Sequence, residues 1–370
     1  MTDPIVNKRK SIFLRIICLV IFAGIIVAGL WPFKFWPENK VEWLKDQNGV
    51  RFYGQGIIYS EKEIAMAPSF RSSNLPSSIS VEICLQPETE ASSHIGRILS
   101  FFDDQGSESF FIGQWRPHLI LGKGIHGKDT YREIGIRDVL KKAEKRFVAI
   151  TSGVDGTRIY VDGILLKSSP RFHLFSINEK PSGKIALGAS PTGSEYWTGN
   201  ILSLAIYDRV LTGQEVSTHS HGSKKSGEEG LVALYPFDER SGQWGYNHAS
   251  RRHLFIPSKF EVLQKTILVP PWVDFRFNRS YLMDILTNIL GFIPFGFFFS
   301  AYLSRKKNMS KRCLFLMAIL LGGSLSLCIE VIQVYLPTRN SQLMDVLANS
   351  MGAILGATLY YLRGHQSASL

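Results

Sequence analysis

The chain has 370 residues, 45% of them hydrophobic and 20% charged, which suggests two or three folding units and excludes both a disulfide-stapled miniprotein and a wholly disordered chain. Lysine and arginine outnumber aspartate and glutamate by 42 to 31, for a formal net charge of +11. That balance often indicates nucleic-acid binding, but here the basic residues gather beside apolar segments and form no basic stripe, so we expect no nucleic-acid partner.

The first apolar segment follows a short basic N-terminus. Residues 1–15 carry more basic than acidic side chains and are predicted to be cytoplasmic. Residues 16–33 are predicted to be the first transmembrane helix, because about 20 apolar residues cross a bilayer. The alternative is a cleaved signal peptide, although this run exceeds the usual apolar length of about 7 to 15 residues. Trp31 and Trp36 at its end fit an interfacial aromatic belt.

Residues 41–262 are predicted to form an exported antiparallel β-sandwich, because this segment consists of short alternating strands separated by turn residues. In 79–85, for example, every second side chain is apolar. Asp162 and Gly163 suit the positive φ angles of a type I′ hairpin turn. Cys84 is the only cysteine of this segment, so no disulfide can form within it, and no cysteine pair has metal-ligand spacing.

Several strand segments resemble the laminin-G-like, concanavalin A-like jelly roll. The resemblance implies a two-sheet sandwich of a kind that often binds glycans. The segment LVALYPFDE at 231–239 resembles the strand that usually opens such domains, yet here it follows the body of the sheet, and we predict that it pairs within the sandwich. The other matching segments are RFVAI at 146–150, TRIYVDG at 157–163, KIALG at 184–188, WTGNI at 197–201 and IYDRVLT at 206–212.

Three tryptophans and one glycine motif of the sandwich are interpreted as structural. Trp115, Trp197 and Trp244 are expected to pack in the core or at its rim, because a sandwich needs such packing merely to fold. The sequence GKGIHG at 122–127 matches Gly-x-Gly-x-x-Gly. No helix is predicted after these glycines, and a phosphate site needs a helix N-terminus there, so no nucleotide site is expected.

Two pairs of potential metal ligands also receive structural interpretations. Asp103 and Asp104 fit a surface turn better than a calcium site. His219 and His221 lie in a stretch rich in serine, glycine and lysine, and are expected to be solvated loop residues, not a metal pair. We therefore predict no metal site in the sandwich.

The C-terminal third contains three further apolar runs, each predicted to be a transmembrane helix. The loop between the first two of them holds five basic residues, and such loops stay in the cytoplasm. Both termini and this loop are therefore placed inside, and the sandwich outside, in the periplasm or extracellular space. The predicted segments are the linker 263–281, the helix 282–303, the cytoplasmic loop 304–312, the helices 313–336 and 343–362, and the cytoplasmic tail 363–370.

Each of these three predicted helices carries two polar side chains on one face. A charged side chain at mid-helix costs on the order of 2.5 to 3.5 kcal/mol in a bilayer, so such groups are informative. The topology places all six in the outer half of the bilayer, below Arg339, which is the expected counter-charge. We predict an outward-facing polar pocket; the alternative is that these groups join the helices by hydrogen bonds. The candidate residues are Asp284, Asn288, Glu330, Gln333, Arg339, Asp345 and Asn349.

The same residues resemble the VanZ-like family of small membrane proteins. The match covers the last three helices and includes FIPFG at 292–296, the polar residues named above, and Gly352. Gly352 and Gly356 favour close helix packing, and Pro294 predicts a kink. The resemblance implies a multidomain fold: a four-helix transmembrane α-bundle, with the antiparallel β-sandwich of jelly-roll type inserted between spans 1 and 2. It also implies a link to glycopeptide (teicoplanin-type) resistance, but no chemistry for these residues.

Together these features predict an integral protein of the plasma or inner membrane. Its predicted partners are the lipid bilayer and a glycan or lipid-linked envelope precursor. One alternative is an intramembrane hydrolase or transferase with Glu330 or Asp345 as general base and Arg339 holding an anionic group. Another is a purely structural, membrane-tethered lectin. No motif supplies an activated nucleophile, so a binding protein is favoured over an enzyme, and no cofactor or metal is expected.

Overall fold

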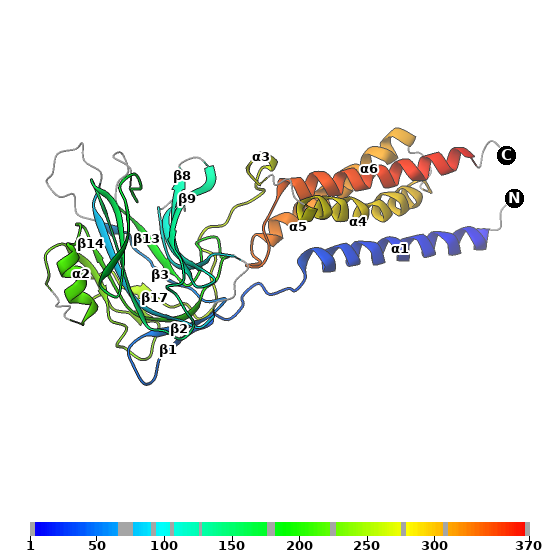
Figure 1. Ribbon diagram of the computed structural model, residues 1–370. Coiled ribbons are helices and arrows are strands. Elements are labelled where there is room, and N and C mark those ends of the chain that lie inside the picture. Colours follow the sequence, from blue (N-terminus) through cyan, green and yellow to red (C-terminus); the bar gives the residue numbers. More distant parts are fainter. Residues whose placement is uncertain are drawn as a thin grey trace. The chain divides into compact units, whose positions relative to one another are not determined.

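The chain folds into two compact units. The structure, a computed structural model, describes residues 4–65, 77–89, 94–103, 107–125, 128–175, 182–222, 227–274, 279–305 and 310–366. The first unit comprises residues 1–35 and 265–370, and the second comprises residues 36–264. Figure 1 shows that the first unit is helical and that the second is built mainly of strands.

The second unit is an antiparallel sandwich of two sheets. One sheet has eight strands in the order β1-β2-β14-β5-β10-β11-β12, with β15 paired to β14. The other has nine strands in the order β16-β17-β3-β13-β6-β7-β8-β9, with β4 paired to β13. The strands are β1 (Val41–Trp43), β2 (Val50–Tyr53), β3 (Ile58–Ser60), β4 (Ile64–Ala65), β5 (Ile79–Pro87), β6 (Gly96–Phe102), β7 (Glu108–Trp115), β8 (His118–Ile125), β9 (Lys128–Ile136), β10 (Arg146–Gly153), β11 (Gly156–Val161), β12 (Ile164–Ser169), β13 (Ser182–Leu187), β14 (Thr198–Tyr207), β15 (Leu231–Tyr235), β16 (Trp244–Gly245) and β17 (Leu254–Phe255).

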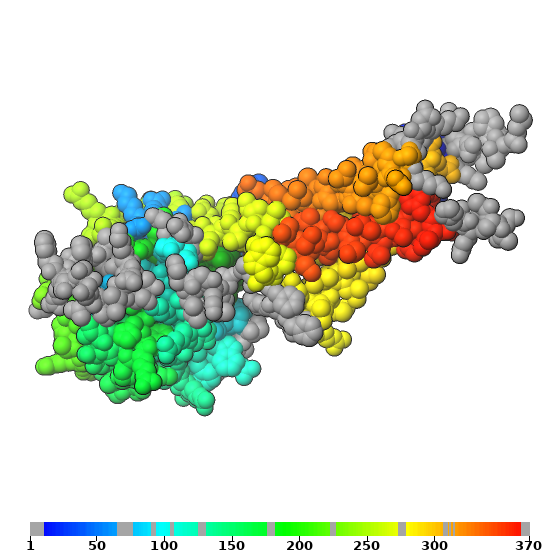
Figure 2. Space-filling model, turned by 90° about the horizontal axis from the view of Figure 1, so that it is seen from above, coloured from blue at the N-terminus to red at the C-terminus, as the bar shows by residue number. Residues whose placement is uncertain are grey.

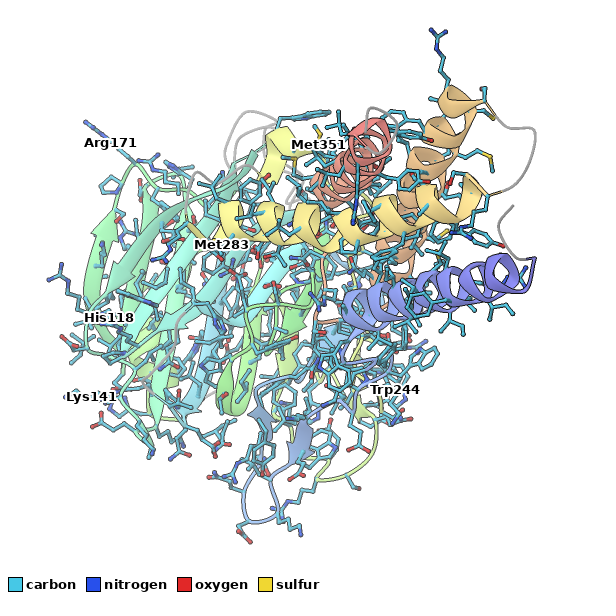
Figure 3. All side chains as sticks on the ribbon, turned by 90° about the vertical axis from the view of Figure 1, so that its right-hand side faces the viewer. His118, Lys141, Arg171, Trp244, Met283 and Met351 are labelled. Atoms are coloured by element: carbon cyan, nitrogen blue, oxygen red, sulfur yellow. The ribbon has the colours of Figure 1, made fainter. Side chains whose placement is uncertain are left out.

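Apolar side chains from both sheets fill the space between them and form the largest core of the unit. In β5, Val81 and Ile83 are at most 1% exposed, and Phe101 of β6 and Phe110 of β7 stack from the other sheet with ring centroids 5.2 Å apart. Polar side chains lie on the outside, where Arg171 projects from the sandwich (Figure 3). Burial of alternate side chains is therefore what holds the two sheets together.

Two predictions about strand pairing are confirmed. Strands β11 and β12 form a hairpin in which Val161 pairs with Ile164, and the two turn residues, Asp162 and Gly163, have φ angles of 51° and 81°. These positive values are those of a type I′ turn. The late strand β15 pairs antiparallel with β14, which places the segment after residue 230 inside the same sandwich.

The first unit consists mainly of four long helices, each apolar and long enough to cross a membrane by length and composition. Helix α1 ends three residues earlier than predicted, because Pro32 cannot continue a helix. Helix α4 continues without interruption through Pro294. The helices are α1 (Pro4–Leu30), α3 (Pro271–Asp274), α4 (Arg279–Leu303), α5 (Lys311–Gln333) and α6 (Leu343–Gln366).

Glycines allow α4 and α6 to pack backbone against backbone. A Cβ added to Gly352 would overlap the carbonyl oxygen of Ile289, and one added to Gly356 would overlap that of Ile293. Helices α4, α5 and α6 lie side by side along their lengths (Figure 2). Small residues permit such close approach of helices in an apolar environment, as predicted for this glycine pair.

Candidate functional site

The buried carboxylate of Glu330 lies at the C-terminal end of α5. Glu330 is only 2% exposed, and its Oε2 accepts a hydrogen bond from the backbone N–H of Gln342 at 2.8 Å. The N–H comes from the loop that leads into α6, so this carboxylate ties the end of α5 to the start of α6. A buried carboxylate needs hydrogen-bond donors around it. The donor here is a backbone N–H, which every residue except proline carries.

A short backbone segment before α4 holds this loop in place. Val269 donates to the carbonyl oxygen of Ser341 at 2.9 Å and accepts from the N–H of Leu343 at 3.0 Å. The Ser341 hydroxyl accepts a third hydrogen bond, from the N–H of Leu268, at 3.1 Å. These contacts form a parallel bridge between Val269 and Gln342. They fix the position of the Gln342 N–H, which donates to Glu330.

Helix α4 contributes an amide to the same end of the helical unit. Asn288 Nδ2 donates to Asp345 Oδ1 in the first turn of α6 at 2.8 Å. The backbone of Gln342 links this pair to Glu330, because its N–H donates to Glu330 Oε2 and its carbonyl oxygen accepts from the Asp345 N–H at 3.2 Å. Three predicted residues, one from each of α4, α5 and α6, are therefore brought to one place. Carboxylate and amide groups together can accept and donate hydrogen bonds to hydroxyl, amine or amide groups of a ligand.

The other four predicted residues have different environments. Gln333 donates to the carbonyl oxygen of Gly29 in α1 at 2.8 Å, and Asn349 donates to the Ser326 hydroxyl in α5 at 2.8 Å. Such bonds join helices, which is the alternative considered for these groups. Asp284 is exposed on the surface of α4.

Arg339, the predicted counter-charge, contacts a backbone carbonyl at the end of α1. Its guanidinium donates to the carbonyl oxygen of Trp31, with Nη2 at 3.1 Å, and within the described part of the chain no ion pair joins it to a carboxylate. Trp31 follows the end of α1, where backbone carbonyls lack helical partners, so a cation is favoured there. The loop after α5 is thereby tied to α1.

The residues that complete this site were not predicted from the sequence. Ser341, Gln342 and Val269 act through backbone groups, which every residue carries. The single sequence feature close to them is the pair of residues Pro270 and Pro271, which marks the end of an extended segment but not its partner. Among the described residues, no group of three or more histidine, cysteine, aspartate or glutamate side chains could hold a metal ion.

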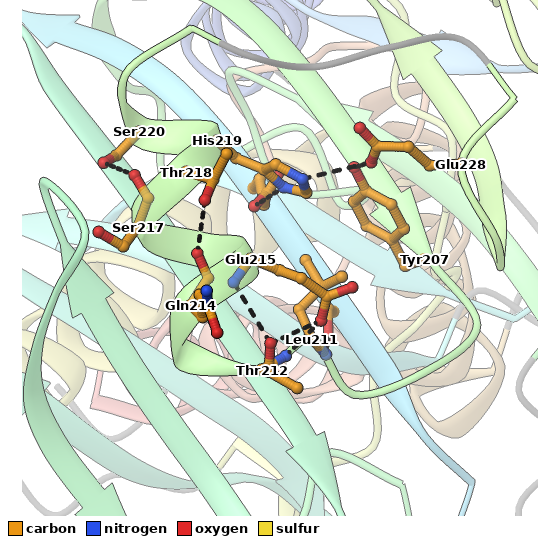
Figure 4. Close-up of polar contacts among 12 residues, drawn as sticks. Tyr207, Leu211, Thr212, Gln214, Glu215, Ser217, Thr218, His219, Ser220 and Glu228 are labelled. Carbon is orange, nitrogen blue, oxygen red and sulfur yellow. Dashed lines mark hydrogen bonds and ion pairs between the residues drawn. The ribbon is translucent and has the colours of Figure 1, made fainter.

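In the sandwich, the interpretation of His219 as a solvated loop residue is wrong. His219 lies in α2 (Gly213–Ser220), is 7% exposed, and contacts two carboxylates: Nδ1 lies 2.9 Å from Glu82 and Nε2 lies 3.4 Å from Glu228. Glu228 also accepts a hydrogen bond from the Tyr207 hydroxyl at 2.8 Å (Figure 4). Burial, followed by the charge of Glu82, raises the pKa of Tyr207. His221, by contrast, is exposed.

The glycine motif has a packing role. Gly122 lies in β8, where an added Cβ would overlap the Phe111 ring, and β9, not a helix, follows. The Arg97 guanidinium stacks on the same ring, 3.4 Å from the Phe111 ring centroid. The glycine thus makes room for a stacked aromatic and arginine pair. Gly127, the last glycine of the motif, lies outside the described residues.

The tryptophans and Asp103 of the sandwich have the structural roles expected of them. Trp197 is 3% exposed and donates to Gln114 at 2.7 Å, and Trp244 packs against Phe255. Asp103 accepts from the Ser107 N–H at 2.8 Å, as in a surface turn, while Asp104 lies outside the described residues. Trp115 is 38% exposed and therefore lies at the rim.

Comparisons with known families agree with this two-part structure. The profile of the VanZ/LLP1 family matches residues 201–364, and a laminin-G profile of the concanavalin A-like lectin/glucanases superfamily matches residues 65–217. The chain therefore combines a VanZ-like region with a laminin-G-like, concanavalin A-like domain, and its four apolar helices make it an integral membrane protein. The VanZ/LLP1 match begins in β14 and so includes part of the sandwich. No curated protein matches the chain by sequence.

Solved structures similar to the chain are sandwich proteins of low sequence identity. A putative carbohydrate-binding protein from Bacteroides ovatus is 13% identical, with a TM-score of 0.40, over 61% of this chain and 62% of that protein. A pentraxin from Limulus polyphemus is 14% identical, with a TM-score of 0.37, over 59% of this chain and 95% of that protein. The botulinum neurotoxin serotype D ligand-binding domain, solved with N-acetylneuraminic acid, is 14% identical, with a TM-score of 0.33, over 50% of this chain and 45% of that protein.

Proposed function

We propose that this protein binds components of the cell envelope at the membrane surface. Helices α1, α4, α5 and α6 form a four-span bundle, and the jelly roll, inserted between the first and second spans, binds glycan outside the membrane. The matches to the VanZ/LLP1 and concanavalin A-like lectin/glucanases profiles support this division of roles. So do the hydrogen bonds that join α1 to the other helices, such as that of Gln333 to Gly29.

The proposed topology follows from the distribution of basic residues. The N-terminal segment, the loop 304–312 and the tail 363–370 carry lysine and arginine next to apolar helices, and these segments are retained in the cytoplasm. The sandwich then lies in the periplasm or the extracellular space. The same topology puts Glu330, Asp345 and Asn288 near the outer surface of the membrane, where a lipid-linked envelope precursor could reach them.

The observation that carries the proposal is the buried Glu330 carboxylate beside the Asn288–Asp345 pair. Acidic side chains in membrane-spanning helices have an unfavourable transfer free energy, and they commonly mark functional sites. Glu330 and Asp345 offer acceptors and Asn288 a donor, which suits recognition of a polar head group. No activated nucleophile is evident in the sequence, so binding is favoured over catalysis. The proposed consequence is a contribution to glycopeptide (teicoplanin-type) resistance.

The test compares the wild-type protein with Glu330→Gln. Glutamine keeps an acceptor oxygen for the Gln342 N–H but removes the charge, so the variant should fold. Mass spectrometry of the detergent-purified proteins should find a polar envelope lipid retained by wild type and lost from the variant. Asp284→Asn is the control, because Asp284 is exposed on α4 and should leave retention unchanged. Turnover of envelope lipids by wild type alone would instead support the hydrolase, and equal retention would support a tethered lectin.

A second experiment addresses resistance directly. Expression of the wild-type protein in a susceptible host should raise the minimal inhibitory concentration of teicoplanin, and Glu330→Gln should return it to the level of the empty vector. No increase with wild-type protein, at equal membrane expression, would refute the resistance role while leaving envelope binding to the retention experiment.

A further inference from the structure

An open row of polar side chains crosses the outer face of the eight-stranded sheet. Arg51 in β2 and Gln86 in β5 each pair with Asn200 in β14, so the three side chains lie next to one another on the same face. Tyr53 lies two residues beyond Arg51 in β2, and Glu88 follows β5. We call these five residues the polar row.

Hydrogen bonds between side chains hold the polar row in one arrangement. Arg51 Nε donates to Asn200 Oδ1 at 2.9 Å, and Asn200 Nδ2 donates to Gln86 Oε1 at 3.1 Å. Gln86 Nε2 in turn donates to the backbone carbonyl of Ala143 at 2.8 Å. Side chain–side chain bonds are only about 10–15% of protein hydrogen bonds, so a continuous run across three strands is unusual. It fixes the planes of the guanidinium and amide groups before any ligand arrives.

The polar row remains accessible, although another part of the same sheet face is covered. Helix α2 and the apolar cluster of Tyr160, Tyr207 and Val216 close that other part. In the row, by contrast, Tyr53 is 42% exposed, and the side chains of Arg51 and Glu88 are 35% and 34% exposed. Asn200, 3% exposed, forms the floor between them.

The other sheet carries an arginine network that is closed by its own partners. Arg97 is 2% exposed, forms ion pairs with Glu108 at 3.3 Å and Glu195 at 2.9 Å, and stacks on Phe111. Its donors are occupied within the protein, so it stabilises the sheet and offers little to a ligand. Tyr131 beside it is 38% exposed, close to the exposure of Tyr53.

We propose that the polar row is the glycan site of the sandwich and that it selects uncharged glycans; this rests on the proposed function. A sugar ring stacks on the exposed face of Tyr53. Its hydroxyl groups accept hydrogen bonds from Arg51 and Gln86 and donate to Glu88. The ion pair of Arg51 with Glu88 at 3.3 Å leaves no net positive charge to attract an anionic chain. Glu42, which accepts from the Tyr53 hydroxyl at 3.2 Å, adds a negative charge beside it.

The test uses the full-length protein in nanodiscs and immobilised hexasaccharides of cellulose, laminarin, maltodextrin and chitin, with oligogalacturonate as the anionic probe. Wild type should bind at least one neutral hexasaccharide more tightly than oligogalacturonate. Tyr53→Ala should weaken that binding about tenfold, as expected for loss of an aromatic stacking contact. Gln86→Ala, a second variant on the neighbouring strand, should weaken it in the same direction. Tyr131→Ala, the matched control on the other sheet, should bind like wild type.

The outcomes separate this inference from the proposed function. Wild-type binding that survives both Tyr53→Ala and Gln86→Ala, or is lost in Tyr131→Ala, would overturn the assignment of the site while leaving glycan binding intact. Tighter binding of oligogalacturonate would overturn the selectivity. If wild type binds none of the probes, glycan binding by the sandwich fails, and the inference fails with it. Thermal unfolding of each variant checks that the substitution leaves the fold unchanged, since Tyr53 and Tyr131 are exposed and Gln86 is half-buried.

Discussion

His219 is held between two carboxylates on the outer face of the eight-stranded sheet. Glu82, one of the two, lies in the central strand β5 and is 0% exposed. A carboxylate at such a position requires polar partners, because transfer from water without them is costly. His219 supplies one of these partners from α2, and Tyr207 and Glu228 extend the network (Figure 4). The helix is thereby attached to the sheet by polar as well as apolar contacts.

Replacement of His219 by alanine should therefore destabilise the sandwich. Loss of a partner to a buried acceptor costs about 1 to 3 kcal/mol of unfolding free energy. His221→Ala is the matched control, since His221 is exposed two residues further along. Thermal or urea unfolding of the full-length protein in detergent measures both variants. Equal stability of the two would show that the contact of His219 with Glu82 contributes nothing.

Helix α2 begins with a capping box. The Thr212 side chain accepts from the Glu215 N–H, and the Glu215 carboxylate accepts from the Thr212 N–H at 2.8 Å. Arg209 adds an ion pair to Glu215 at 2.7 Å. The hydrogen bond from Arg209 is the main cause of a pKa of about 2 for Glu215, with the bonds from Thr212 adding to it. Deprotonated Glu215 thus stabilises the start of the helix.

This lowered pKa predicts how stability depends on pH. The folded pKa lies below the ordinary value of 4.5, so the stabilisation is complete above pH 4.5 and is lost as the pH falls towards about 2. Glu215→Gln should lower the unfolding free energy by about 1 kcal/mol at neutral pH, the usual worth of a cap. The difference from wild type should shrink between pH 4.5 and pH 2. Unfolding curves over this range check the prediction, and a difference independent of pH would contradict it.

The contact between α4 and α6 depends on glycine at Gly352. A side chain there would meet the carbonyl oxygen of Ile289 and the Cβ of Phe292, the latter at 2.9 Å. Gly352→Ala should force the helices apart and lower stability by roughly 1 to 3 kcal/mol, as overpacking does. Gly291→Ala, on the open side of α4, should be neutral or stabilising, because nothing lies within 4 Å of its added Cβ. Thermal unfolding in detergent distinguishes the two; similar losses in both would refute close packing at Gly352.

The proposed topology can be tested by labelling. In a background without native cysteines, Asp155→Cys in the sandwich should react with a membrane-impermeant maleimide in intact cells or spheroplasts. The Asp155 side chain is 73% exposed, so access is not limited by the fold. Arg305→Cys, in the loop after α4, should react only after the membrane is permeabilised. The opposite pattern would place the sandwich in the cytoplasm and exclude the proposed encounter with exported glycans.

The elements of both units could be predicted from local sequence patterns. Apolar runs and alternating strands follow from the periodicity of burial, and the turn at Asp162 and Gly163 follows from backbone sterics. Helix α2 was missed, although Thr212 and Glu215 have the spacing of a capping box. The serine- and glycine-rich residues after it favoured a loop, and the histidine within it was misplaced accordingly.

Apolar helices and strands are identifiable from local residue patterns, because the periodicity of apolar side chains in each segment reflects which of them will be buried. The partners of the polar side chains, by contrast, depend on how the helices pack together. Glu330 is paired with a backbone N–H of Gln342, and Arg339 with the carbonyl of Trp31. Every residue carries the same backbone groups, so the sequence does not reveal which of them a side chain will contact. The rotation of each helix is set by packing at residues such as Gly352. Partners of this kind emerge only when the helices are assembled.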